Sequence, residues 1–359
     1  MDKQNKKKHS IKKRLYAVLG TALAVFAVLC TGVRVHEFSY ASHQTALAAA
    51  IFSMSNGTFK LVENAPQDTT QNSQQEVTAQ PQTQPPTVPA TAPVREGVKK
   101  LPIKETQYGA GGEQYRNFFV KNKTNFNLNV GQELKEPLGF KIDKNSNEPQ
   151  VLIMHTHTCE SFIEYDEGFY YEDFYPRTTD VSKSIAKVGD SIVASLKKAG
   201  IAAIADKTIH DSPSYTGSYD RSYETIENYI KKYPSIKVVL DIHRDSISDD
   251  NSTKMKPTFV YNGQKGAQIM ILSGYDEDGS YDFPDWNYNL RFALRLQQTA
   301  ETMFPGISRP LDFGDYVYNE NINTGSLLIE IGADSNTLAE AEYTGQLLGE
   351  ALGKVLTSG

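Results

Sequence analysis

From residue 151 onwards, short continuous apolar runs alternate with segments whose apolar residues recur at helical spacing. Short apolar runs typical of buried strands lie at 151–154, 201–205, 238–242 and 326–331, with weaker ones at 259–262 and 269–272. Apolar residues at helical spacing predict helices over 181–199, 220–233, 286–304 and 337–356. Strands and helices in this order form βαβ units. The pattern predicts an α/β domain with a mainly parallel sheet flanked by helices, and ligands beyond the carboxyl ends of its strands.

The N-terminus has the pattern of a membrane anchor. Residues 15–33 are nineteen residues without a charge, which as a helix span roughly 28 Å, close to the thickness of a bilayer core. Residues 1–14 carry seven Lys and Arg against one Asp, and such cations stay on the cytoplasmic side. A cleaved signal peptide is the alternative, because small residues follow the apolar run. We expect a single-pass protein of the cell membrane with a cytoplasmic N-terminus and an exported body.

Between the anchor and the domain the chain lacks apolar periodicity. Residues 34–63 form a membrane-proximal segment, and 64–98 are rich in Gln, Pro, Thr and Ala. Such a composition predicts a disordered tether, with an r.m.s. span of roughly 30–35 Å. Residues 99–149 are weakly patterned and are expected to extend the main domain, residues 150–359, at its N-terminal side.

The charge distribution argues against a nucleic-acid partner. The total is −6, the basic tip contributes +6, and the rest of the chain therefore sums to −12. Binding phosphates needs a basic face on the folded part, which this acidic body does not offer. Two cysteines, Cys30 and Cys159, do not make a disulfide framework.

Histidines and carboxylates gather where the predicted strands end. The run at 151–154 leads into His155, His157 and Glu160, the run at 238–242 leads into His243, and Glu330 lies late in the run at 326–331. Parallel strands bring such residues to one edge of the sheet. Neutral imidazoles and a carboxylate are the ligands of a catalytic Zn²⁺, which keeps one position for water. The sequence therefore predicts a zinc site at this edge.

Glu330 is the candidate general base, because its apolar strand neighbours should raise its pKa towards neutrality. The alternative is a structural ion pair of Glu330 with Arg244 or Arg291. Either Asp241 or Asp245, which flank His243, is expected to orient its imidazole.

Three further features each allow two interpretations. Cys159 suggests a thiolate nucleophile with His155 or His157 as its base, although no cysteine-hydrolase signature surrounds it. His210 is either a structural residue or part of the site. The aromatic and acidic segment 162–176 is either a loop packed on the domain or the wall of a groove for a sugar-peptide polymer.

Taken together, the motifs resemble the stage II sporulation protein P family. The resemblance is carried by the stretches 151–162 (VLIMHTHTCESF), 206–219 (DKTIHDSPSYTGSY), 241–245 (DIHRD) and 327–336 (LLIEIGADSN). The basic tip, anchor and polar tether also look like that family. One departure is Cys159, where the family pattern leads us to expect serine.

The resemblance implies a zinc-dependent N-acetylmuramoyl-L-alanine amidase with a fold similar to the amidase-3 group, and an endopeptidase activity on stem-peptide cross-links. That group binds zinc through a His-Glu-His set and uses a distant glutamate as base. By this resemblance His243 is the second histidine and Glu330 the base, while the first histidine is His155 or His157. Glu160 is the candidate carboxylate ligand. In the amidase-3 group the glutamate ligand is at the start of the following helix, but residues 181–199 of this chain contain no glutamate. Asp180, Glu164 and Glu172 therefore remain alternative candidates for the carboxylate ligand.

The resemblance also implies partners and a setting. The substrate is peptidoglycan, and Arg244, Asp245 and Asn336, which lie in the matched motifs, are expected to contact it. Stage II sporulation protein D, a lytic transglycosylase, is the expected partner in septal wall thinning and engulfment of the forespore. Two other functions compete, namely a wall-binding scaffold without turnover and a metallo-carboxypeptidase or deacetylase acting on the same substrate.

Overall fold

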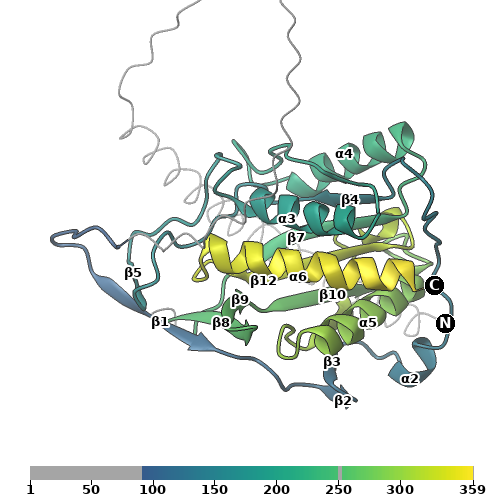
Figure 1. Ribbon diagram of the computed structural model, residues 1–359, viewed down its shortest axis with the longest axis horizontal. Helices are drawn as coiled ribbons and strands as arrows, with labels where there is room; N and C mark the ends of the chain where they lie inside the picture. Colours follow the sequence, from purple (N-terminus) through teal and green to yellow (C-terminus); the bar gives the residue numbers. More distant parts are fainter. Residues whose placement is uncertain (1–90, 250–252, 359) are drawn as a thin grey trace, which may run out of the picture. The chain divides into compact units, whose positions relative to one another are not determined.

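The computed structural model describes residues 91–249 and 253–358, which belong to one compact unit of the chain. A mixed eight-stranded sheet forms the centre of this unit (Figure 1). In spatial order its strands are β2 (Glu113–Tyr115), β3 (Phe118–Asn122), β11 (Leu311–Asp315), β10 (Ile269–Tyr275), β12 (Ser326–Ala333), β7 (Val238–Asp245), β4 (Val151–Met154) and β6 (Ala203–Ala205).

Five of the seven strand pairings in this sheet are parallel. Strands β12, β7, β4 and β6 run in one direction. Strands β10, β11 and β3 run in the opposite direction, because β10 pairs antiparallel with β12 while β11 and β3 are parallel to β10. The predicted α/β class with a mainly parallel sheet is therefore confirmed. The reversal at β10 was not predicted, because the apolar run that marks a buried strand carries no information on its direction.

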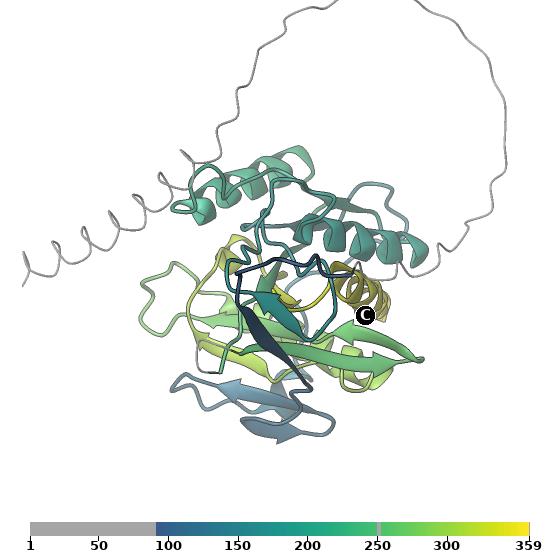
Figure 2. The ribbon, with the colours of Figure 1, turned by 90° about the vertical axis from the view of Figure 1, so that its left-hand side faces the viewer.

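Helices cover both faces of the sheet (Figure 2). Three helices, α3 (Ile185–Lys198), α5 (Trp286–Met303) and α6 (Leu338–Thr357), bury their apolar sides on one face. On the other face, α4 (Ser218–Lys232) packs Ile226 against Leu152 and Met154 of β4. Since Ile153 belongs to the core on the α3 side, β4 is buried on both faces, as a continuous apolar run requires.

A second sheet of four strands lies beside the first (Figure 1). Its order is β5 (Phe169–Tyr171), β1 (Lys100–Thr106), β8 (Lys254–Tyr261) and β9 (Gln264–Ala267). Residues 99–149 thus supply strands to both sheets, together with the short helix α2 (Val130–Glu133). The aromatic segment 162–176 packs here, with Tyr165, Tyr170 and Tyr171 buried in one apolar cluster, whereas Tyr175 is exposed.

The predicted anchor at 15–33 and most of the predicted tether at 64–98 lie outside the described residues. Of the helices within the described ranges, none is long and apolar enough to cross a membrane.

Candidate active site

The register of three neighbouring strands sets the geometry of the site. In the parallel pair β7 and β12, His243 lies opposite Glu330, and in the pair β4 and β7, Asp241 lies opposite Met154. Side chains that share a register position point to the same face of a sheet. Asp241, His243 and Glu330 therefore lie on the face that α4 covers, at the carboxyl end of the strands.

His155 lies on the opposite face, towards α3. Its Nδ1 donates to the carbonyl oxygen of Ile242 at 2.8 Å, and its Nε2 is so close to α3 that a Cβ on Gly189 would lie 2.7 Å from it. Complete burial lowers the pKa of His155 to about 4. These contacts describe a neutral imidazole that packs β4 against α3.

His157, two residues later, lies beside His243. The two rings meet edge to face with centroids 5.2 Å apart, and the ring of Tyr215 stacks on His157 at 4.3 Å. Burial and the neighbouring His243 lower the pKa of His157 to about 4. Its Nδ1 is buried and has no hydrogen-bond partner within the described ranges, and Asp211 Oδ2 lies 3.9 Å away. The structure thus brings His157, and not His155, to His243.

Glu160 completes a group of three with the two histidines. A turn places it, since its N–H donates to the carbonyl of His157 at 2.9 Å and its own carbonyl accepts from Ile185, the first residue of α3. Glu160 Oε2 accepts from the N–H of Arg244 at 3.0 Å and lies 3.6 Å from His243 Nδ1. Burial raises the pKa of Glu160, and the charges of His243 and Arg244 oppose that rise.

The other three carboxylates considered as ligands lie elsewhere. Asp180 accepts from Ser182 at the surface, Glu172 accepts from the N–H of Lys99, and Glu164 is exposed. Glu160 is therefore the carboxylate of this set that lies beside His243.

Asp241 is the carboxylate that faces the far side of the His243 ring. Its Oδ1 lies 2.9 Å from His243 Nε2, and it accepts from both the N–H and the hydroxyl of Thr156. Burial by itself lowers the pKa of His243, but the charges of Asp241, Glu160 and Glu330 outweigh it and raise that pKa to about 10. Of the two aspartates considered for this role, Asp245 instead pairs with Arg309.

Glu330 has the properties of a carboxyl group held neutral near pH 7. Burial raises its pKa to about 8, against the opposing charge of His243. Its Oε2 is buried and finds no hydrogen-bond partner among the described residues. The considered ion pairs are not formed, because Arg291 pairs with Glu133 and Arg244 lies against Glu160.

The three residues expected to bind substrate have contacts within the protein. Arg244 donates to the carbonyls of Ser161 and Pro176, and Asp245 pairs with Arg309. Asn336 is fully buried and bonds the N–H of Ala333, the carbonyl of Pro257 and Glu340. Their role in substrate binding stays a prediction.

His210 and Cys159 support the loop that carries the site. His210 bonds the carbonyl of His155 at 2.9 Å and the hydroxyl of Thr225 at 3.1 Å, as the structural interpretation expected. Burial and the neighbouring Asp211 raise the pKa of Cys159 to about 12. A thiol with so high a pKa is a poor nucleophile, so the cysteine mechanism is not supported.

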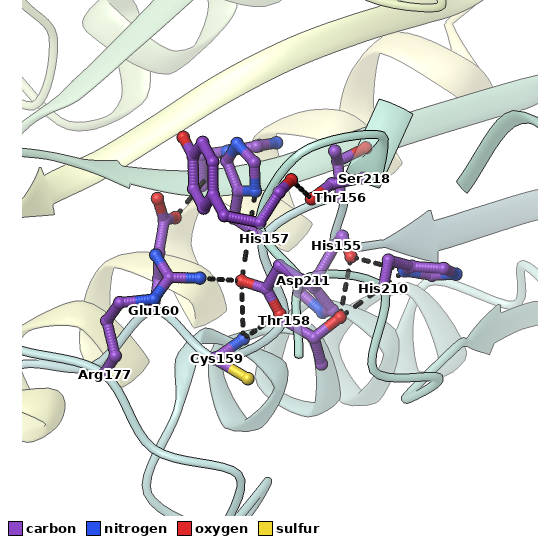
Figure 3. A network of polar contacts seen from close by, with 12 residues as sticks. His155, Thr156, His157, Thr158, Cys159, Glu160, Arg177, His210, Asp211 and Ser218 are labelled. Carbon is purple, nitrogen blue, oxygen red and sulfur yellow. Dashed lines mark hydrogen bonds and ion pairs between the residues drawn. The ribbon is translucent and has the colours of Figure 1, made fainter. Parts of the chain in front are cut away.

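Four residues near the site were missed by the sequence reasoning, namely Arg177, Asp211, Tyr215 and Tyr219. Figure 3 shows Arg177 and Asp211 beside His157, where they form an ion pair, and Asp211 also accepts from the N–H of Cys159. The ring of Tyr219 lies parallel to that of His243 at 6.4 Å. Asp211, Tyr215 and Tyr219 all lie in the stretch 206–219, so the motif itself was the available signal.

The donor set fits zinc in its chemistry, although no three His, Cys, Asp or Glu within the described ranges stand where they would hold a metal ion. In a tetrahedral site two ligand atoms lie about 3.3 Å apart, close to the 3.6 Å between His243 Nδ1 and Glu160 Oε2. In each histidine one ring nitrogen faces a carboxylate: Nδ1 of His157 faces Asp211, and Nε2 of His243 faces Asp241. The second ring nitrogen of each would then be the one that binds metal. Carboxylates behind the imidazoles are typical of zinc sites.

Comparison with known proteins identifies the family. The family model of stage II sporulation protein P matches residues 18–353. The chain belongs to this family. Stage II sporulation protein P of Bacillus subtilis (strain 168) is 28% identical over 205 residues, which cover 54% of this chain and 47% of that protein. The chain thus matches about half the length of that curated relative, and the resemblance seen in the motifs is confirmed.

Among solved structures, the chain is similar to the N-acetylmuramoyl-L-alanine amidase AmiC2 of Nostoc punctiforme, with 14% identity and a TM-score of 0.35 over 59% of this chain and 97% of that one. It is also similar to an N-acetylmuramoyl-L-alanine amidase from Clostridium difficile 630, with 16% identity and a TM-score of 0.33 over 60% and 100% of the two chains. Similarity at these TM-scores supports no conclusion about activity.

Proposed function

We propose that this protein is a zinc-dependent peptidoglycan hydrolase that cuts the amide bond between N-acetylmuramic acid and L-alanine. The observation that carries the proposal is the convergence of His157, Glu160, His243 and Glu330 at one edge of the sheet, in a chain of the stage II sporulation protein P family. Three of them supply the donors that zinc prefers, and the fourth is a carboxyl group with a raised pKa.

His157, Glu160 and His243 would hold the metal. Zinc in such a site polarises a carbonyl group and lowers the pKa of bound water. Its charge would also balance a local excess of carboxylates, because Glu160, Asp241 and Glu330 surround the imidazole of His243. Asp211 and Asp241 keep the two rings oriented, and Arg177 holds Asp211 in turn.

Glu330 is the group that moves the proton. A carboxyl whose pKa lies near the working pH can accept a proton from water and return it to the leaving amine. Its pKa of about 8 without metal falls when a cation lies nearby, which brings Glu330 into the range of a general base. The strand β12 fixes its position opposite His243.

The wider assignments belong to the same proposal. The substrate is peptidoglycan, with cross-link cleavage in the stem peptides as a second activity, in septal wall thinning and engulfment during sporulation. We further propose a membrane-anchored protein with its catalytic domain outside the cytoplasm, and stage II sporulation protein D as its partner. The family match supports the sporulation setting.

A chelation experiment with the full chain tests the proposal. Removal of metal should abolish release of soluble fragments from purified peptidoglycan, and Zn²⁺ should restore it. The variant Glu330→Gln should still bind about one Zn²⁺ per chain but lose roughly 10²-fold or more in rate, because the proton acceptor is gone. Activity that survives chelation, or an unchanged rate in Glu330→Gln, contradicts the mechanism.

A further inference from the structure

Arg309 lies close to Glu330 at the same edge of the sheet. The segment before β11 pairs with the start of β10, where the N–H of Arg309 donates to the carbonyl of Ile269 at 2.8 Å. The next residue of β10, Met270, lies opposite Glu330 of β12. The charge of Arg309 accordingly acts on Glu330 and opposes the rise of its pKa.

The guanidinium of Arg309 is held at one end only. Arg309 is 6% exposed, and its Nη1 donates to Asp245 Oδ2 at 2.8 Å. Its Nε and Nη2 are buried and have no hydrogen-bond partner within the described ranges. These two nitrogens form the side-on fork of an arginine, whose parallel N–H groups match the two oxygens of a carboxylate.

Within residues 91–249 and 253–358, no carboxylate is hydrogen-bonded to this fork. Asp334 is paired with Lys254, Asp245 already binds Nη1, and in the described part of the chain Glu330 Oε2 and the Nε and Nη2 of Arg309 have no hydrogen-bond partner. Unpaired donors on a buried charged group are strongly unfavourable. An arginine fixed by Asp245 with its fork unpaired is preorganised for a carboxylate supplied by a ligand.

We propose that Arg309 binds a free carboxylate of the substrate's peptide beside Glu330 and so selects acidic peptides. This inference rests on the proposed function, because the stem peptides of peptidoglycan carry free carboxylates. Asp245, which was expected to bind substrate, is then a positioning residue that orients Arg309.

Equilibrium binding tests the proposal without catalysis. The ligand is the stem tripeptide L-Ala-γ-D-Glu-diaminopimelate, compared with the same peptide after conversion of its carboxylates to carboxamides. Calorimetry on the full chain loaded with Zn²⁺ should give at least about tenfold tighter binding of the acidic form, as expected for charged hydrogen bonds. In Arg309→Gln the two forms should bind within about threefold of each other.

Two variants control for other effects. Arg291→Gln removes a partly buried arginine that pairs with Glu133, and it should keep the full preference. Arg309→Lys keeps the charge but loses the fork, so most of the preference should disappear even if Arg309→Gln does not fold. Equal binding of both forms by the wild type, no binding of either form, or an undiminished preference in Arg309→Lys, overturns the proposal.

Turnover of a muramoyl peptide, measured in parallel, separates the two proposals. A wild-type protein that prefers the acidic peptide but releases no product contradicts the amidase function and supports the Arg309 site. A wild-type protein that hydrolyses both forms at equal kcat/KM supports the amidase function and overturns the Arg309 site.

Discussion

At the scale of single residues, the unusual feature is an imidazole surrounded by negative charge. His243 has Asp241 at 2.9 Å on one ring nitrogen and Glu160 at 3.6 Å on the other, with Glu330 opposite on the next strand. Without metal, a proton on His243 balances part of this charge, which is why its pKa rises to about 10 although burial alone would lower it. Beside His157, Asp211 lies 3.9 Å away and is paired with Arg177, so burial and the neighbouring His243 prevail and lower the pKa of His157 to about 4.

Zinc binding should therefore release protons. At pH 7 the metal-free protein carries a proton on His243 and most of one on Glu330, whereas His157 is already neutral. A zinc ligand must be unprotonated, so binding should release at least about one proton, and the affinity should rise with pH. Calorimetry in buffers of different ionisation enthalpy measures the number. Glu330→Gln should lower it towards one, and release of no proton removes His243 from the ligand set.

Substitutions of His155 and His157 should differ in their effect on zinc binding. His157→Gln should weaken zinc binding by roughly 10²-fold or more, because a ligand is lost. His155→Gln should keep zinc but lower the free energy of unfolding, because His155 bonds the carbonyl of Ile242 and packs against Gly189. Metal analysis together with urea unfolding checks both. Loss of zinc in His155→Gln with retention in His157→Gln would contradict this assignment.

The sequence alone left these two histidines equivalent. Both follow the same strand, and the choice between them depends on which face of the sheet His243 occupies. That face is set by the register of β4 against β7, where Asp241 lies opposite Met154, and no spacing in the sequence reports it. The raised pKa of Glu330 was predictable, because its strand neighbours are apolar. The free fork of Arg309 was not, since its position depends on the reversed direction of β10.

At the scale of elements, the patterns that predicted well were those with a buried apolar side. The bounds of helices α3, α5 and α6 differ from the predicted bounds by at most four residues, and each helix packs its apolar residues into the main core. Strands β1, β5, β9 and β11 were missed, because β1 is polar and half exposed, with a proline, β5 and β9 are short, and β11 contains two aspartates and a glycine. The N-cap Ser184 explains why α3 begins at Ile185 and not at 181.

The start of α6 provides a test of stability independent of the site. Thr337 accepts from the N–H of Glu340, and the Glu340 side chain accepts from the N–H of Thr337, which makes a capping box. Thr337→Ala should lower the free energy of unfolding by about 1 kcal/mol. Thr357→Ala, at the other end of the helix, should change it by less than about 0.5 kcal/mol. Urea unfolding of both variants measures the difference, and equal values would contradict the cap.

At the scale of the whole molecule, one edge of the sheet carries the proposed metal ligands, the proposed general base Glu330 and Arg309 on one side of the fold. His157 and Glu160 follow β4, His243 lies in β7 and Glu330 lies in β12. Arg309 lies in the segment before β11, which pairs with the start of β10. Such an arrangement suits an amide bond between a sugar acid and an acidic peptide. Part of the formal acidic charge of the chain after residue 14 lies in the carboxyl groups around His243, namely those of Glu160, Asp241 and Glu330.

Mass spectrometry of the products released from purified peptidoglycan tests the central claim most directly. The amidase reaction predicts free stem peptides that begin with an N-terminal L-alanine, together with glycan strands freed of peptide. Glu330→Gln should release both at least roughly 10²-fold more slowly. Products in which every stem peptide stays attached to muramic acid, with only cross-links cut or terminal residues removed, would contradict the claim that this site cleaves the muramoyl-L-alanine amide.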